Sequence, residues 1–324
     1  MTDRKREPAL QAKIAGQKLG NIAWKITRFI LLIGIEFVLI YPVLFMFVTA
    51  FRGRADMEDP SIVWITRTWT LDNIKTLFTA MDYPSLLGYT AAISFGSALL
   101  QTFVCSFVGY GFARFDFPLK KVLFAIVVMT IIVPVQTYLS PLYMMFRFFR
   151  IPGISDLLDL IAAGSGTWKL IDTAGPFWVQ SLLGMGFRSG LFIFIYRQFY
   201  RGMPGELEEA ALIDGCGMIR TYFRVMMPNV RSSMITVFIF SVVWHWNDYY
   251  LPAVFSETRQ TVATSLASLR STLERLATQN GSDLLTVQVQ VQAGALLAIA
   301  PMLVLFVIAQ RYFTEGVERS GIVG

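Results

Sequence analysis

Charged side chains are scarce in this sequence. Only 15% of its 324 residues are Asp, Glu, Lys or Arg, and 55% are hydrophobic, whereas soluble domains usually carry roughly a quarter charged residues. The deficit excludes an ordinary water-soluble fold. The net charge is +6, but no stretch interleaves aromatic and basic side chains in the manner of a nucleic-acid groove. The basic excess therefore indicates a membrane surface, and nucleic acid is excluded as a partner.

Cysteine and histidine, which build many metal and redox sites, are also nearly absent. Cys105 lies in an apolar run and Cys216 in a polar loop, a spacing that gives no support to a disulfide or a metal site. The single histidine, His245, cannot form a proton relay or a metal site alone, so we expect it to pack at a membrane interface. No nucleophile stands in a pattern with a base. The sequence predicts no metal, no catalytic residue and no enzyme.

An ATP site of the phosphate-loop type is missing as well. Such a loop needs a lysine that directly follows a glycine and precedes Ser or Thr. None of the eight lysines follows a glycine. The chain therefore cannot hydrolyse ATP by that route, and any ATP-driven process needs separate subunits that carry the site.

Long apolar runs are what the sequence has instead. A bilayer core of about 30 Å takes about 20 apolar helical residues to cross. Six such runs lie near residues 28–51, 88–113, 122–146, 177–199, 232–255 and 287–310. Pro134 and Pro141 in the third run, and Gly96, Gly109 and Gly111 in the second, predict kinks and close helix contacts. The predicted fold is an all-α integral membrane protein with six transmembrane helices.

The basic residues give these spans an orientation. Residues 1–27 form a basic amino-terminal arm before the six-span domain of residues 28–324. Lys and Arg gather at both ends of the chain and in the loops after the second and fourth runs. Fewer stand in the longer segments 52–87, 147–176 and 256–286. The positive-inside rule therefore predicts that both termini and the loop of residues 200–231 are cytoplasmic.

The 200–231 loop carries helix signals that a simple linker lacks. Pro204 can begin a helix, three glutamates follow near its positive end, and Gly215 can end it. Four residues at helical spacing form one narrow face with small side chains at its centre, which a partner can approach closely: Leu207, Ala210, Ala211 and Asp214. The pattern predicts a short docking helix near residues 204–215.

A second amphipathic helix follows in the same loop and ends at Pro228. The residues expected to share its apolar face are Ile219, Tyr222, Phe223, Met226 and Met227. Helices of this kind also lie on membrane surfaces or pack under their own bundle. Periodicity alone does not separate these alternatives.

The order of residues in this loop matches a known signature. The run from Glu209 to Ala211 is followed after three residues by Gly215, and after nine more by the run from Val225 to Pro228. This pattern resembles the signature cytoplasmic loop of ABC-importer permeases. The resemblance implies that the helix before Gly215 is a coupling helix, which sits in a cleft of an ATP-binding subunit. The docking element that it implies consists of Glu209, Ala210, Ala211, Asp214 and Gly215.

Five further segments are similar to permeases of maltose-system-like carbohydrate importers: GYGFARFDFPLKK, PVQTYLSPLYMMF, GLFIFIYRQF, WNDYYLP and QRYFTEGVERSGIVG. The resemblance implies a sugar importer of the bacterial cytoplasmic (inner) membrane that works by alternating access. The implied partners are a second homologous permease subunit in a heterodimer, two ATP-binding cassette subunits, an extracellular or periplasmic sugar-binding protein, and membrane lipid. It implies no cofactor on this chain, because ATP and Mg are bound by the ATPase subunits.

Polar residues inside the predicted spans are candidates for the translocation pathway. Aromatic rings and hydrogen-bonding side chains are the chemistry that holds sugar hydroxyls. The candidates are Gln101, Gln136, Trp246, Asn247 and Asp248. An interfacial aromatic belt with a structural Asn-Asp pair is the open alternative for the last three. Charges within spans are usually functional or paired. We expect Glu36 in the first run to hydrogen-bond within the bundle, and a position lining the pathway is the open alternative.

A secondary transporter or channel driven by an ion gradient is the alternative function. It predicts charged relays inside the membrane and often broken helices in two repeats. The charges inside the spans are few, and the two halves of the sequence show no evident repeat. Both observations favour the importer.

Overall fold

The computed structural model describes residues 6–59, 61–62, 64–150, 168–280 and 284–320. Residues 151–167 of the predicted outer segment 147–176, and residues 281–283 of the segment 256–286, lie outside the described residues. Within the described ranges the chain is helical and contains no strand. Two isolated bridges, between Arg52 and Trp69 and between Phe149 and Trp168, are the extended pairings that these ranges contain. The prediction of an all-α protein is confirmed.

Three described helices contain segments long and apolar enough to cross a membrane. They are α1 (Arg6–Ala50), α4 (Tyr83–Arg114) and α16 (Leu284–Ser320). Their apolar segments are Gly20–Ala50, Tyr83–Arg114 and Leu285–Gln310, with mean hydropathies of 2.5, 1.7 and 2.4. They correspond to the first, second and sixth predicted runs, so the sequence located these three correctly.

The other three predicted runs are each broken into shorter helices. Pro134 lacks an amide hydrogen and separates the two halves of the third run, and Asp248 ends the first half of the fifth with an extended backbone. The pieces are α5 (Lys120–Ile132), η1 (Val135–Thr137), α6 (Leu139–Arg147), α8 (Gly175–Leu182), α9 (Ser189–Gly202), α13 (Arg231–Asn247) and α14 (Tyr250–Phe255). The count of six spans stays a prediction.

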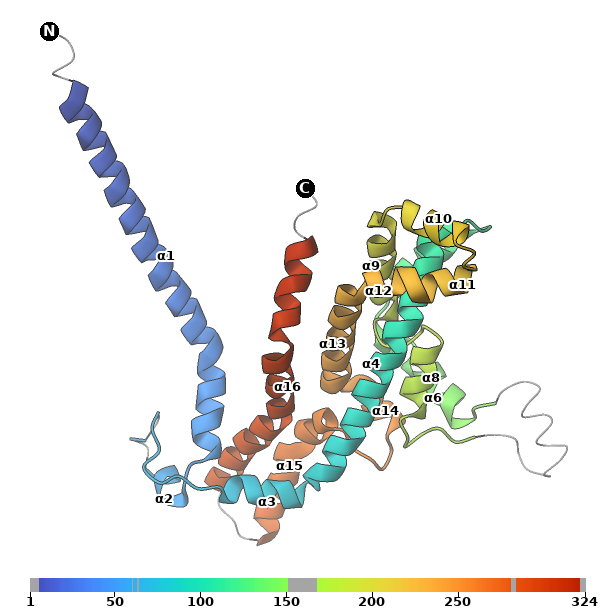
Figure 1. The fold of residues 1–324 in the computed structure, drawn as a ribbon. Helices are drawn as coiled ribbons and strands as arrows, with labels where there is room; N and C mark the ends of the chain where they lie inside the picture. The colour runs from blue at the N-terminus through green and yellow to red at the C-terminus, as the bar shows by residue number, and fades with distance from the viewer. Residues whose placement is uncertain (1–5, 60, 63, 151–167, 281–283, 321–324) are drawn as a thin grey trace, which may run out of the picture.

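The helical bundle is centred on α4, which packs along α9, α13 and α8 (Figure 1). Glycine allows α4 and α9 to approach closely, because a Cβ on Gly109 would lie 2.6 Å from Cβ of Tyr196 on α9. The helix α1 points away from this bundle, and the carboxyl-terminal end of α1 contacts α16 (Figure 1). Glu36 is exposed on α1, so the expected hydrogen bond within the bundle is absent from the described part of the chain.

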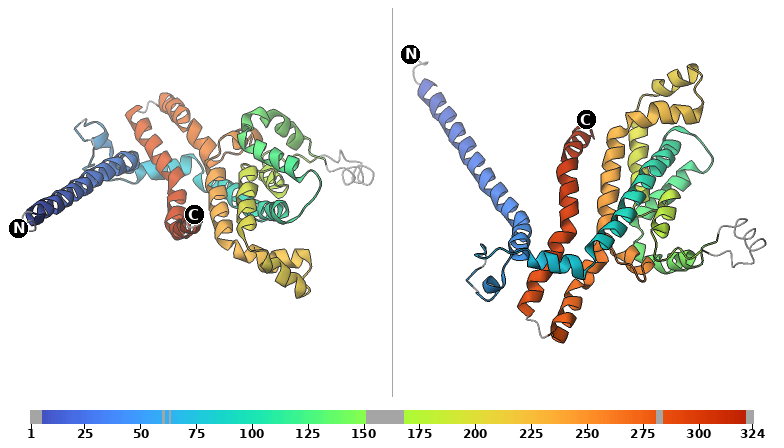
Figure 2. Two further views of the ribbon diagram at one scale, coloured as in Figure 1. Left: turned by 90° about the horizontal axis from the view of Figure 1, so that it is seen from above. Right: turned by 60° about the horizontal axis from the view of Figure 1, so that its bottom comes forward.

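The 200–231 loop folds into α10 (Glu206–Ile213), α11 (Met218–Thr221), η2 (Tyr222–Met226) and α12 (Met227–Asn229). It lies at the same end of the molecule as the amino-terminal end of α1 and the carboxyl end of α16 (Figures 1 and 2). The opposite end holds α2 (Arg54–Met57), α3 (Asp72–Ala80) and α15 (Val262–Asn280). This arrangement agrees with loops that alternate between two sides of a membrane.

The segment after α1 is closed by one buried carboxylate. Asp56 is 3% exposed, and its Oδ2 accepts hydrogen bonds from the Thr66 hydroxyl at 2.5 Å and from the amides of Arg67 and Thr68 at 2.6 and 2.7 Å. These bonds, that of the Thr66 hydroxyl first, lower the pKa of Asp56 to about 2. Asp56 therefore holds the loop residues 66–68 against α2.

We expect Asp56→Asn to open this segment, because the amide loses the charge that three donors share. The amides of Arg67 and Thr68 should exchange with solvent about 10-fold faster. A carboxylate with a lowered pKa stabilises the fold above its unfolded pKa of about 4, and this stabilisation is lost as the pH falls toward 2. In the wild type, the protection of these two amides against hydrogen exchange, corrected for intrinsic rates, should therefore be lower at pH 3 than at pH 5. In the variant, the protection should be the same at both pH values. Equal protection of both proteins at pH 5 would contradict the role of Asp56.

Candidate functional site

The helix α10 begins at Glu206, two residues after Pro204, and ends at Ile213, close to the predicted stop at Gly215. Its first turn holds Glu206, Glu208 and Glu209, which interact favourably with the positive end of the helix dipole. Gly215 follows the helix with φ of +78°, a left-handed conformation that glycine adopts without strain. Its amide donates to the carbonyl of Leu212 at 3.0 Å. Gly215 therefore stops the helix, as predicted.

The predicted docking face of α10 is only partly open. Ala211 is 6% exposed and is covered by its own chain, whereas Leu207, Ala210 and Asp214 are exposed. The expectation that all four residues face a partner is therefore wrong for Ala211. Helical spacing shows which residues lie on one side of a helix, but it does not show which of them the rest of the chain covers. Ala211 is buried on the inner side of α10, which packs on η2 and α11, whereas Glu209 and Ala210 are exposed.

The second helix of the loop is interrupted by a π-helical turn, Tyr222–Met226. The five residues predicted to share an apolar face do not do so: Tyr222 and Met226 are buried, but Ile219 and Phe223 are 68% and 51% exposed. Hydrogen bonds from i to i+5 widen the turn, and this changes which residues share a side. The segment then bends by 78° into α13.

Exposed apolar side chains gather around the turn between α10 and α11. The set, called here the loop surface, consists of Leu212, Ile213, Met218, Ile219 and Phe223, which are between 51% and 86% exposed. Exposed apolar groups in one place mark protein contact sites. The residues Leu212, Ile213 and Met218 were not predicted as part of a contact surface. The available signal was their position on either side of the glycine-containing turn between the two helices.

Arg114, the last residue of α4, joins that helix to α10. Its Nε lies 3.4 Å from Oε2 of Glu208, and its Nη2 donates to the carbonyl of Met203 at 2.7 Å. The side chains of Arg114 and Glu208 are 16% and 18% exposed. A largely buried pair is costly to break, because the remaining charge loses its partner. The pair therefore fixes α10 to the end of α4.

A hydroxyl network makes a second connection between the loop and the bundle. The Tyr222 hydroxyl on η2 donates to the Ser106 hydroxyl on α4 at 3.0 Å, and Ser106 lies 2.8 Å from the Tyr200 hydroxyl on α9. All three residues are buried. These bonds connect η2 to both α4 and α9.

Among the predicted pathway residues, Gln101 is fully buried and its amide is used inside the chain. Its Nε2 donates to the carbonyl of Phe187 at 2.9 Å and to the Ser189 hydroxyl at 2.8 Å. Its Oε1 accepts from the Ser241 hydroxyl at 2.5 Å. Gln101 thus holds together α4, α13 and the start of α9.

The remaining pathway candidates divide into two groups. Trp246 is 3% exposed and its indole donates to the carbonyl of Ala298 at 3.2 Å, while Asp248 is 6% exposed and accepts from the Tyr250 amide at 3.0 Å. Asn247 and Gln136 are exposed. The structure therefore does not bring the five candidates together on one open surface. Near them, His245 is buried and its Nδ1 lies 2.9 Å from the carbonyl of Ser241.

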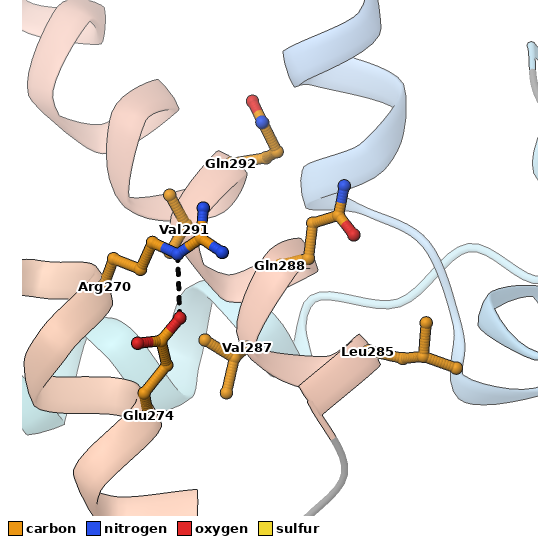
Figure 3. Close-up of a pocket in the computed structure, with 7 residues that line it drawn as sticks. All are labelled: Arg270, Glu274, Leu285, Val287, Gln288, Val291 and Gln292. Atoms are coloured by element: carbon orange, nitrogen blue, oxygen red, sulfur yellow. Dashed lines mark hydrogen bonds and ion pairs between the residues drawn. The ribbon is translucent and has the colours of Figure 1, made fainter.

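A separate cavity of about 390 Å³ lies between α15 and the first turns of α16 (Figure 3). Arg270 and Glu274, paired at 2.8 Å, line one side, and Gln288 and Gln292 line the other. None of the predicted site residues lies in its wall. It stands at the end of the molecule opposite α10 (Figure 1), so it is distinct from the loop surface.

Known proteins are similar to this chain over most of its length. The family described as "Binding-protein-dependent transport system inner membrane component" matches residues 105–319. The arabinooligosaccharide transport system permease protein AraQ of Halalkalibacterium halodurans is 26% identical over 295 residues, which are 90% of this chain and 93% of the relative. The melibiose/raffinose/stachyose import permease protein MelC of Bacillus subtilis is 30% identical over 238 residues, 72% and 74% of the two chains.

A solved structure has the same fold. It belongs to a bacterial ABC transporter that imports the acidic polysaccharide alginate, and it superposes with a TM-score of 0.71 over 91% of this chain and 98% of that chain. The sequence identity is 15%, so this likeness concerns the fold alone.

Proposed function

Because the chain belongs to the family of inner membrane components of binding-protein-dependent transport systems, we propose that it is a permease subunit of a bacterial ATP-driven importer of oligosaccharides or related sugars. Relatives named as permeases for arabinooligosaccharides and for raffinose-type sugars support the choice of cargo. The observation that carries the proposal is the exposed loop surface. It is apolar, it is attached firmly to the bundle, and it lies on a chain without a phosphate-binding Gly-Lys pair of its own.

In the proposed mechanism the loop surface and the exposed side of α10 dock on an ATP-binding cassette subunit. Glu209, Ala210, Asp214 and Gly215 contact that subunit directly, and Ala211 keeps α10 seated. ATP and Mg are held by the ATPase subunits. When these close, the movement of α10 reaches α4 through the Arg114–Glu208 pair and the Tyr222–Ser106 hydrogen bond.

The helix α4 carries the movement to the far side of the membrane. It is unbroken over 32 residues, a length of about 48 Å. Its far end is attached to other elements, because the Tyr83 hydroxyl donates to the carbonyl of Leu297 on α16 at 2.8 Å. Rotation of this helix would open the bundle alternately to each side, with the broken third, fourth and fifth runs completing six spans. Asn247 and Gln136, which are exposed, would line the pathway.

The proposed assembly contains a second homologous permease, two ATPase subunits and an external sugar-binding protein. Both termini and the 200–231 loop are cytoplasmic in this proposal, which agrees with their common end in the fold (Figure 1). The exposed apolar side chains of α1 face lipid and the second permease. A heterodimer is proposed from the resemblance of the sequence to maltose-system-like permeases.

The test is copurification followed by reconstitution. The tagged chain is expressed together with its neighbouring genes, and we expect it to recover an ATPase and a second permease. In proteoliposomes, uptake of labelled oligosaccharides should require ATP and the binding protein, and it should survive ionophores that dissipate ion gradients. Uptake by the chain alone, abolished by ionophores, would instead identify the ion-driven transporter.

A further inference from the structure

One basic residue lies in the middle of a predicted span. Arg188 stands in the break between α8 and α9, at the centre of the predicted run 177–199. The break reverses the chain with two left-handed residues, Gly184 with φ of +69° and Arg188 with φ of +61°. A left-handed conformation is uncommon for arginine, and such strain persists where the surroundings hold it in place.

A buried polar side chain forms hydrogen bonds with the residues of this break. Gln101 donates to the carbonyl of Phe187 and to the hydroxyl of Ser189, the residues on either side of Arg188. Gly186 allows this approach, since a Cβ there would lie 2.6 Å from Nε2 of Gln101. The backbone on both sides of Arg188 is therefore fixed from α4.

The guanidinium of Arg188 lies beside aromatic rings. It stands 4.8 Å from the ring centre of Trp244 and 5.3 Å from that of Phe187. Trp244 is itself stacked between Phe192, at 5.3 Å, and Phe240, at 5.6 Å. Cation–π contact with these rings positions the guanidinium and leaves its hydrogen-bond donors free for a planar anion.

Such a charge is costly inside a membrane without a polar partner. Arg188 is exposed on this chain, and within the described residues no carboxylate forms an ion pair with it. Charged residues in spans face the interior of the bundle or a water-filled cavity and mark substrate routes. Arginine pairs with carboxylates through two parallel hydrogen bonds. An exposed arginine held beside half-buried aromatic rings therefore provides a contact for an anion.

We propose that Arg188 binds the carboxylate of an acidic saccharide, a sugar acid of the uronate type, with Trp244 holding the guanidinium in position. This inference rests on the proposed function, because it assigns the charge class of the imported cargo. It makes Gln101 a positioning residue for Arg188, rather than a pathway residue that contacts the cargo.

The test measures binding to the purified permease complex in nanodiscs, without the binding protein. The probes are disaccharides of galacturonate, glucuronate and mannuronate, each compared with its methyl ester, which keeps the rings and removes the charge. We expect the wild type to bind at least one acid more than about 10-fold tighter than its ester. Arg188→Gln should weaken binding of that acid about 10-fold or more and leave the ester within about 2-fold. Arg188→Lys should retain part of the preference.

The matched control is Arg28→Gln, which removes the same charge from the exposed side of α1 and should leave both affinities unchanged. Three results would overturn the proposal: equal binding of acids and esters by the wild type, equal weakening of both by Arg188→Gln, or loss of the second permease from the Arg188→Gln complex. The last result would mean that a carboxylate of the partner permease pairs with Arg188. Failure of the proposed function is a different result, namely the absence of ATP-driven uptake of every saccharide by the wild-type complex.

Discussion

Replacing Ala211 with tryptophan should abolish ATP-driven uptake while the protein still inserts into the membrane. Ala211 is 6% exposed on the inner side of α10, so a large ring there has no space and displaces α10 from η2 and α11, on which it packs. Overpacking of this kind typically costs about 1–3 kcal/mol. This cost is local and is small beside the energy of inserting the spans. The expected loss of uptake is therefore a loss of coupling, measured in proteoliposomes at equal protein content.

The matched control for this prediction is Ala211→Ser, which adds one small atom and should keep most of the uptake. Recovery of the ATPase by copurification should fall in the tryptophan variant and remain in the serine variant. If the Ala211→Trp complex keeps normal uptake, or keeps the ATPase with full stimulation of its activity, then α10 is not the coupling helix.

The second large effect is expected at Gly109. A Cβ at this position would lie 2.6 Å from Cβ of Tyr196 and 3.1 Å from the backbone nitrogen of Arg197, so Gly109→Leu forces α4 and α9 apart. Because α9 is a main neighbour of α4, we expect the Tm of the purified complex to fall by about 5 °C or more. The measurement is a thermal unfolding scan in detergent.

Gly111 offers a close control, since it lies two residues further along α4 and a Cβ there meets nothing within 4 Å. Gly111→Leu makes the same chemical change in the same helix and should leave the Tm nearly unchanged. A similar fall in both variants would mean that the effect arises from α4 itself and not from its contact with α9.

Several features of the fold could be predicted because they depend on local chemistry. The absence of charge from long runs predicts membrane helices, since an unpaired charge in hydrocarbon is costly. Pro134 interrupts the third run because proline cannot donate a backbone hydrogen bond. Gly215 ends α10 because the left-handed conformation there suits glycine.

The candidate site was predicted only in part. The order of residues from Glu209 to Pro228 located the loop and its first helix, but it assigned Ala211 to the exposed side and placed Ile219 on one face with Tyr222. The π-helical turn at Tyr222–Met226 has no simple sequence signal. It arises with the burial of Tyr222 and Met226 against α4 and α9, a contact between segments more than 100 residues apart for Tyr222 and Ser106.

By itself the sequence determined that the chain is helical and that it carries runs apolar enough to enter a membrane. It also located the 200–231 loop, which we propose as the contact with a partner. Tertiary structure alone decided which side of each helix faces the bundle. In lipid the hydrophobic effect does not distinguish the packed side of a helix from the exposed side, because both surfaces are apolar. Hydrophobic periodicity is therefore weak in the spans, and the roles of Gln101, Gly109 and Arg188 follow from the neighbours that the fold brings to them.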